Sequence, residues 1–171
     1  MKTHSASLIF MSALLFLLLS LTIHTRAEVI TLTADTFSDK VKEKDTAWFV
    51  KFCVPWCKHC KNLGSLWEDL GKVIEGEDEI EIGEVDCSTS KPVCSKVDIH
   101  SYPTFKLFYD GEEVAKYQDC LPWCGSDNDD ICCGENLGLV RPRDVESLKA
   151  FVLEEAEKAA TKSQLDSDKE L

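Results

Sequence analysis

Apolar and polar positions repeat with two different periods along the chain, and these periods predict where strands and helices lie. Alternation over residues 29–33 and 80–86 predicts two strands that are each partly exposed. The nearly continuous apolar run over 46–52 predicts a strand buried on both faces, as in the centre of an α/β sheet. From Cys57 to Ile74 apolar residues recur every three or four positions, which predicts an amphipathic helix.

The remaining segments complete the order of elements. Short helices are predicted from Asp35 toward Lys44 and from Cys87 to Val97, and a final helix opens at Pro142. Strands at 105–109 and 112–117 flank Asp110-Gly111, a dipeptide typical of tight hairpins. The resulting order, β-α-β-α-β-α-β-β-α, predicts an α/β fold with a central mixed sheet and helices on both faces.

Both ends of the chain carry features of targeting. An uncharged run from Leu8 to Ile23, followed by small residues before Ala27, predicts a secretory signal peptide over residues 1–27. The alternative is a membrane anchor, but the run is shorter than the roughly 20 residues that span a bilayer. After Ala160 the composition turns polar, so residues 161–171 are expected to form a mobile tail. The tail ends in Asp168-Lys169-Glu170-Leu171, which is similar to the retrieval signal of the endoplasmic reticulum with its first two residues reversed; the alternative is an ordinary acidic tail.

Charge and cysteine content narrow the function classes. The formal net charge is -12, and removing residues 1–27 takes away Lys2 and Arg26 and makes it -14. So acidic a chain is not expected to bind nucleic acid. Nine cysteines behind a signal peptide indicate an oxidising compartment, and an odd number leaves at least one thiol free or paired between molecules.

Cys57 and Cys60 are the candidate reactive residues. They lie three apart after a buried strand and Pro55, at the first turn of the predicted helix, where free backbone N–H groups stabilise a thiolate at Cys57. His59 between them adds positive charge when it is protonated. The strand, proline and helix setting favours a redox pair, with Cys60 as the resolving thiol, over a structural disulfide or half of a zinc site.

Two further features, a cysteine pair and a proline, each allow two structural interpretations. Cys87 and Cys94 can close an eight-residue ring worth about 2.5 kcal/mol in the chain-entropy treatment, or remain two buried free thiols. Pro103, just before a strand, is either a cis proline after Tyr102 or an ordinary trans proline.

These motifs together resemble the thioredoxin-fold domains of the protein disulfide isomerase family, and most of all its plant single-domain members. The matching segments are Pro55 to Lys61, Val85 to Cys87, and Tyr102 to Phe108. The resemblance covers about residues 29–117 and 142–171, so we expect a thioredoxin-like domain over 28–160.

The resemblance implies roles for individual residues. Cys57 attacks, Cys60 resolves and His59 tunes both, while Arg143 swings toward the inner cysteine and favours its release as thiolate. Substrate chains dock beside a cis Pro103, with Trp56 and Tyr102 as neighbours in the binding surface. Cys87 and Cys94 match a structural disulfide of some family domains.

Several positions depart from the family pattern. Lys58 stands where glycine is usual, Cys53 replaces an aromatic residue behind the site, and Ser65 replaces the proline that kinks the helix. Lys51 occupies the place of a buried acid that relays protons, so that relay is not expected to run through a carboxylate. Lys51 is either a lysine that gives up its proton easily or a solvated lysine.

Residues 118–141 do not fit the family pattern. In the family, only a few residues connect the last strand to the final helix. This Cys-rich insert holds Cys120, Cys124, Cys132 and Cys133, which can pair with each other or bind zinc, although no histidine lies near. Asp127 stands where a second redox site would need its other thiol. The resemblance stops at Tyr117 and resumes at Pro142, and no part of the family pattern is missing between them. Our hypothesis is therefore that the insert comes from an alternative or mis-spliced transcript.

The sequence therefore predicts a thiol–disulfide oxidoreductase of the endoplasmic reticulum lumen that makes, reduces or rearranges disulfides in folding secretory proteins. Glutathione or an oxidase of that compartment is the expected redox partner; no cofactor, metal or, after signal cleavage, membrane is required, and the expected state is a monomer. The alternative is a thioredoxin-fold chaperone or adaptor that binds proteins without redox turnover.

Overall fold

The computed structural model describes residues 29–77, 79–118 and 142–169. The signal peptide and the insert predicted from the sequence lie outside the described residues, except for Gln118. The described elements are, in chain order, β1 (Ile30–Thr31), α2 (Phe37–Lys40), β2 (Ala47–Cys53), α3 (Lys58–Asn62), α4 (Gly64–Ile74), β3 (Ile80–Asp86), α5 (Lys91–Lys96), β4 (Thr104–Tyr109), β5 (Glu112–Tyr117) and α6 (Val145–Lys169).

The five strands form one mixed sheet in the order β1-β3-β2-β4-β5. β1 and β2 run parallel to β3, whereas β4 pairs antiparallel with both β2 and β5. The hairpin between β4 and β5 turns at Asp110 and Gly111, both with positive φ, as a tight hairpin turn requires. The predicted mixed α/β sheet is confirmed.

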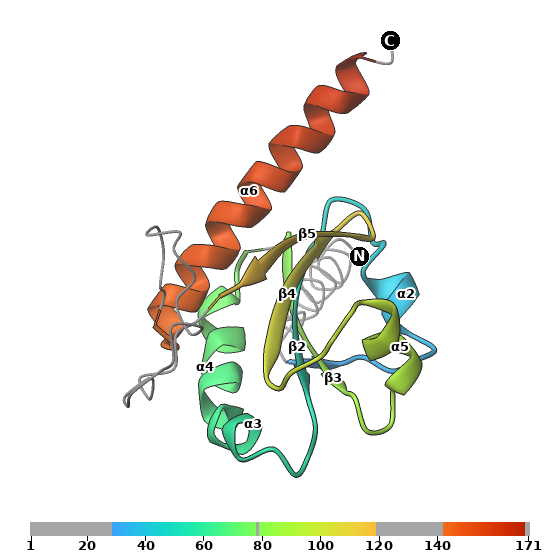
Figure 1. Ribbon diagram of the computed structural model, residues 1–171. Coiled ribbons are helices and arrows are strands. Elements are labelled where there is room, and N and C mark those ends of the chain that lie inside the picture. Colours follow the sequence, from blue (N-terminus) through green and yellow to red (C-terminus); the bar gives the residue numbers. More distant parts are fainter. Residues whose placement is uncertain (1–28, 78, 119–141, 170–171) are drawn as a thin grey trace, which may run out of the picture.

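Helices cover both faces of the sheet, as Figure 1 shows: α4 and α6 along one face, α2 and α5 along the other. Successive side chains of β2 point to opposite faces. Ala47 and Phe49 join the core under α4 and α6, while Trp48, Val50 and Phe52 join the core under α2 and α5. The apolar pattern of β2, which only Lys51 interrupts, follows from this double burial, because neither face of the strand meets water.

The helices differ from the prediction in extent. α2 is a single turn, because the chain turns after Val41 and Asp45 adopts a positive φ of 58°. The helix expected to run on from Cys57 is divided at Leu63 into α3 and α4, although no proline is present there. α6 continues to Lys169, so the region beyond Ala160 is helical; in Figure 1 its end projects past the sheet.

Asp144 caps the start of α6 by accepting hydrogen bonds from the Ser147 backbone N–H at 2.8 Å and its hydroxyl at 3.0 Å. The end of β5 is tied to this start, because the Tyr117 hydroxyl donates to the backbone oxygen of Pro142 at 2.6 Å. The described residues before and after positions 119–141 therefore lie close together. Among the residues described, no helix is both long and apolar enough to cross a membrane.

Candidate active site

The predicted redox residues lie where β2 ends and α3 begins. Cys57 is the N-terminal cap of α3 with an extended backbone, φ -72° and ψ 118°. Its side chain is half-buried, whereas Cys60, inside the first turn of α3, is only 7% exposed. Cys57 is thus the outer thiol and Cys60 the inner one, as the sequence predicted.

The strand end that carries Pro103 lies next to Cys57. The Cys57 thiol donates to the backbone oxygen of Tyr102, with 3.6 Å between sulfur and oxygen. The bond between Tyr102 and Pro103 is cis, which confirms one of the two alternatives for this proline. Both residues are half-buried, so the segment forms part of the surface around the outer thiol.

The pairing of the cysteines differs from the prediction. Cys60 forms its disulfide with Cys53, not with Cys57, and Cys57 is a free thiol. Cys53 is the last residue of β2, and its Cα lies 5.9 Å from that of Cys60, a normal spacing for a disulfide. We had treated Cys53 only as a substitution behind the site. The alternation along β2 was the signal for its position, because it places Cys53 on the face that α3 and α4 cover.

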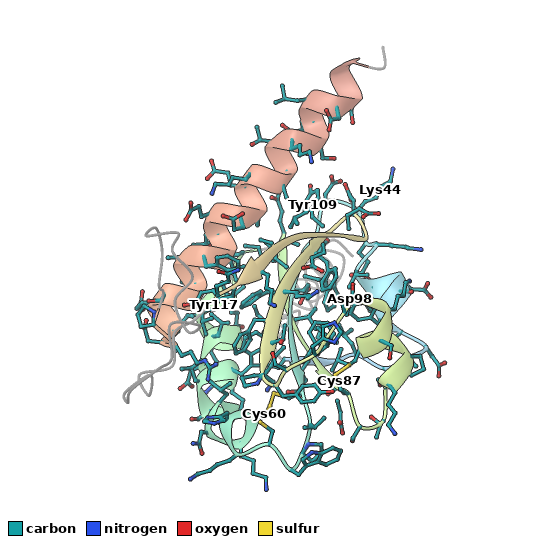
Figure 2. The ribbon with its side chains drawn as sticks, viewed as in Figure 1. Lys44, Cys60, Cys87, Asp98, Tyr109 and Tyr117 are labelled. Atoms are coloured by element: carbon teal, nitrogen blue, oxygen red, sulfur yellow. A yellow bond between two sulfur atoms is a disulfide. The ribbon has the colours of Figure 1, made fainter. Side chains whose placement is uncertain are left out.

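The second disulfide joins Cys87 to Cys94, confirming that predicted pair. It connects the residue after β3 with α5 and closes the same sequence interval, seven residues, as the bond between Cys53 and Cys60. Figure 2 shows both sulfur bridges at the same end of the molecule, near the labels of Cys60 and Cys87.

Lys51 is buried rather than solvated, which corrects one of our two interpretations. Its side chain is 9% exposed, and its Nζ lies 2.9 Å from a carboxylate oxygen of Glu84. The two residues are partners in the parallel register of β2 and β3. Nζ also lies 5.5 Å from the Trp67 ring centre, a favourable cation–π position. Glu84 therefore places a carboxylate beside Lys51 from the neighbouring strand, a contact that the sequence did not indicate.

A cavity of about 250 Å³ gives access to the inner cysteines. Its lining includes Lys51, Cys53, Pro55, Cys60, Glu84 and Asp86. We refer to it as the inner cavity. Lys61 also lines it, so two cations and two carboxylates lie around the disulfide of Cys53 and Cys60.

A second cavity, of about 310 Å³, lies on the Cys57 side. It is lined by Trp56, Tyr102 and the disulfide of Cys87 and Cys94, among others. We refer to it as the outer cavity. Trp56 is 71% exposed and is the most exposed large apolar side chain among the described residues. An exposed tryptophan beside a reactive thiol is suited to contact with a polypeptide.

His59 and Arg143 surround the site at longer range. His59 is exposed on α3, as is Lys58. Arg143 is half-buried, and its guanidinium lies 6.0 Å from the centre of the Phe105 ring. Burial lowers the pKa of Arg143 from its ordinary value, and the charges of nearby Tyr117 and Cys57 oppose the shift. The guanidinium therefore lies at the edge of the core, on the side of the outer cysteine.

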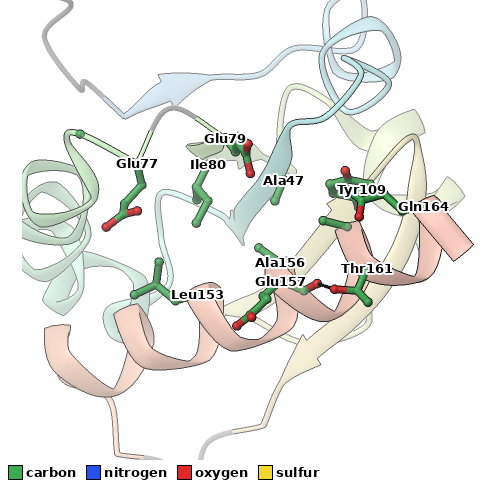
Figure 3. A pocket seen from close by; sticks show the side chains of 12 residues that line it. Ala47, Glu77, Glu79, Ile80, Tyr109, Leu153, Ala156, Glu157, Thr161 and Gln164 are labelled. Carbon is green, nitrogen blue, oxygen red and sulfur yellow. Dashed lines mark hydrogen bonds between the residues drawn. The ribbon is translucent and has the colours of Figure 1, made fainter.

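A further cavity, of about 510 Å³, lies at the opposite end of β2 from the cysteines. Figure 3 shows Ala47, Ile80 and Tyr109 of the sheet facing Leu153, Ala156 and Thr161 of α6. No thiol lines it, so we do not assign the redox chemistry there. Within the described part of the chain no group of three or more ligating side chains is placed to hold a metal ion.

The chain belongs to the thioredoxin family, whose pattern matches residues 28–125. It is 66% identical over 146 residues to protein disulfide-isomerase 5-1 of Arabidopsis thaliana, covering 85% of this chain and 84% of the relative. It is 64% identical over 153 residues to protein disulfide isomerase-like 5-1 of Oryza sativa subsp. japonica, covering 90% and 89%. The recognised resemblance to the protein disulfide isomerase family is confirmed, and the chain is a thiol–disulfide oxidoreductase.

Solved structures support the fold. The Trx4 domain of ERdj5 aligns with a TM-score of 0.57 at 26% identity, covering 77% of this chain and 97% of that one. The J-Trx1 fragment of ERdj5 gives the same TM-score at 28% identity, covering 77% and 53%. Human ERp44 in its zinc-bound form, at 21% identity and a TM-score of 0.57, is similar in fold alone.

Proposed function

We propose that this oxidoreductase makes, reduces and rearranges disulfides in secretory proteins that fold in the endoplasmic reticulum. The observation that carries the proposal is the Cys57 thiol. It is free, half-exposed and placed between Trp56 and the Tyr102–Pro103 segment, with Cys60 buried three residues behind it.

The chemistry is thiol–disulfide exchange. In reduction, the Cys57 thiolate attacks one sulfur of a substrate disulfide, a mixed disulfide forms, and the other substrate sulfur leaves as thiolate. Cys60 then attacks Cys57, which frees the second substrate thiol and leaves Cys57 bonded to Cys60. Oxidation runs through the same steps in reverse. Glutathione or an oxidase of the compartment resets the pair.

The surroundings of Cys57 provide for substrate binding. An extended substrate segment would lie along the outer cavity, against Trp56 and Tyr102, and would reach the neighbouring Pro103. Lys58 and Arg143 carry positive charge, and so does His59 when it is protonated. These charges favour the thiolate forms of the cysteines during exchange. These residues therefore assist the reaction, whereas Cys57 and Cys60 carry it.

The proposed location and state rest on the sequence. A signal peptide over 1–27 and a retrieval-like end at 168–171 favour the lumen of the endoplasmic reticulum. We also propose that the domain acts as a monomer on locally accessible bonds. The direct test is insulin reduction by the Cys57→Ser variant. We expect turnover to be abolished, and full turnover would refute the assignment.

A binding function without redox turnover is the second candidate, and the exposed Trp56 is the observation that favours it. The two functions separate in one comparison. If the Cys57→Ser variant loses insulin reduction but suppresses aggregation of an unfolded protein as well as the wild type, the domain also acts as a chaperone. If aggregation is not suppressed by either protein, this second function is excluded.

A further inference from the structure

The disulfide between Cys53 and Cys60 places three cysteines, not two, in reach of one another. We call Cys53, Cys57 and Cys60 the redox centre. Cys60 is bonded to Cys53 at the end of β2, and Cys57 lies three residues before Cys60 at the start of α3. Residues three apart on a helical turn are neighbours, so Cys60 has a possible partner on either side.

The position of Cys53 follows from the strand that carries it. Lys51 and Cys53 share one face of β2, and Lys51 lies over the Trp67 ring of α4, so this face is the one that α3 and α4 cover. The backbone oxygen of Cys53 accepts a hydrogen bond from the Cys87 backbone N–H at 2.8 Å, which continues the sheet to the end of β2. Cys53 therefore meets Cys60 from a fixed strand end.

We propose that Cys53 is a third catalytic cysteine that exchanges with Cys57 for the disulfide to Cys60. This inference rests on the proposed function, because it concerns how the same site stores its disulfide. Starting from a bond between Cys57 and Cys60, the Cys53 thiolate attacks the sulfur of Cys60. The bond between Cys53 and Cys60 forms, the bond between Cys57 and Cys60 breaks, and Cys57 leaves as thiolate. The proton that Cys53 lost is balanced by the one that Cys57 takes up, and the centre is neither oxidised nor reduced.

The exchange gives the redox centre two forms that hold the same number of disulfides but react differently. With Cys57 bonded to Cys60, the centre is an oxidant for substrate thiols. With Cys53 bonded to Cys60, the half-exposed Cys57 is a nucleophile that can open a wrong substrate disulfide while the centre still holds its own disulfide. In that second form Cys60 cannot resolve the mixed disulfide at once. The substrate stays attached until one of its own thiols attacks Cys57, or until two molecules of a small thiol such as glutathione reduce the Cys53–Cys60 bond, leave as its disulfide and free Cys60 to attack.

The inner cavity gives this stored disulfide its own route to solution. Cys53 and Cys60 both line it, whereas Cys57 is not among its lining residues. The charged residues of this lining, Lys51 and Lys61 with Glu84 and Asp86, balance in formal charge, and Lys51 is paired with Glu84. A small thiol such as glutathione can reduce the stored disulfide from this side and be oxidised in turn, without displacing a polypeptide bound over Cys57.

The test is disulfide mapping after oxidation with oxidised glutathione. The chain is expressed from its full coding sequence, reduced, oxidised, and its free thiols are blocked with N-ethylmaleimide under mildly acidic conditions. Trypsin and chymotrypsin together then cut on both sides of each cysteine of the centre. Cys53 is recovered on residues 53–56, Cys57 on 57–58 and Cys60 on 59–61, so mass spectrometry distinguishes the two possible bonds.

We expect peptide 53–56 linked to peptide 59–61 in the wild type, with N-ethylmaleimide on Cys57. In the Cys57→Ser variant the same link should persist, and in the Cys60→Ser control it should be lost. Recovery of only the link between Cys57 and Cys60 in the wild type would overturn the proposal. The proposal would also be overturned if, in the Cys57→Ser variant, Cys53 and Cys60 were not bonded to each other and both carried N-ethylmaleimide or glutathione.

Insulin reduction by the wild type, measured in parallel, tests the proposed function separately. A wild type without turnover contradicts that function whatever the mapping shows. Normal turnover with no bond between Cys53 and Cys60 contradicts the third cysteine alone.

Discussion

The Sγ atom of Cys57 lies 3.6 Å from the backbone oxygen of Tyr102, so the outer thiol is hydrogen-bonded to the segment that carries Pro103. The two residues are 45 positions apart in sequence and come from opposite sides of the sheet's C-terminal edge, one from the start of α3 and the other from the loop before β4. We therefore expect a polypeptide that reaches Cys57 to contact this loop, so that substrate binding and exchange use the same surface.

Trp56 should matter for protein substrates and not for small ones. Replacing this 71% exposed side chain by alanine removes a contact beside Cys57 without disturbing the core. We expect Trp56→Ala to lower kcat/KM for insulin by roughly tenfold, as for an aromatic contact worth more than about 1 kcal/mol. Reduction of oxidised glutathione should be unchanged. Val114→Ala, at another exposed apolar position, is the matched control, and equal effects of both variants on insulin would contradict the role of Trp56.

The ion pair between Lys51 and Glu84 should respond unequally to loss of its two partners. Lys51 is 9% exposed and Glu84 39%, so the carboxylate can be solvated alone and the ammonium cannot. We expect Glu84→Gln to lower the free energy of unfolding by about 1–3 kcal/mol, as for a buried charge left without its partner. Lys51→Met should lower it by less than about 1 kcal/mol. Urea unfolding at neutral pH measures both, and the reverse order would show that Glu84 is the more dependent partner.

Glu81 on β3 should make stability depend on pH in a definite direction. Burial, and then repulsion from Glu43, raise the pKa of Glu81 above its ordinary value of 4.5, while Lys40 opposes the shift. A raised pKa means that the folded state binds the proton more tightly than the unfolded state. The resulting stability is fully present below pH 4.5 and is lost as the pH rises through the pKa of the folded state.

At neutral pH the charged Glu81 therefore opposes folding. Glu81→Gln should raise the midpoint of thermal unfolding at neutral pH, and this gain should disappear below pH 4.5, where the wild-type side chain is neutral too. The comparison needs only thermal scans at the two pH values. A gain of the same size at both would mean that the charge of Glu81 is not its cause.

The disulfide between Cys87 and Cys94 should act on stability. Replacing both cysteines by alanine removes the cross-link without leaving a free thiol, and the loss expected for so short a ring is about 2.5 kcal/mol. Denaturant unfolding of the double variant measures this loss. Because the pair also lines the outer cavity, insulin turnover at a temperature where the variant is folded serves as the control. Unchanged stability with lost turnover would reverse our assignment of the pair as structural.

Local patterns predicted most of the fold because the two hydrophobic periods differ clearly along this chain. The β2 run, the amphipathic α4 and the Asp110-Gly111 turn each carry their structure in a few consecutive residues. The division at Leu63 was not predicted, since its neighbours Asn62 and Gly64 do not by themselves end a helix at that point. The length of α6 was underestimated because its last turns are polar and exposed, so they give no hydrophobic period.

At the site, the sequence predicted which residues gather but not all of their partners. Spacing and turn chemistry located Cys57, Cys60 and Pro103. The Glu84 partner of Lys51 depends on the register between β2 and β3, which is a long-range property that no local pattern contains. Cys53 was within reach of sequence reasoning, since alternation along β2 places it with Lys51 on the helix-covered face. Its role was not predicted because the spacing of Cys57 and Cys60 already accounted for a two-cysteine redox motif.

The central claim is that Cys57 carries the exchange, and insulin reduction by Cys57→Ser tests it most directly. The variant should be compared with the wild type and with Ser65→Ala, a control at an exposed position of α4, after circular dichroism has shown that all three are folded. The account predicts no turnover for Cys57→Ser and wild-type turnover for Ser65→Ala. Full turnover by a folded Cys57→Ser variant would contradict it.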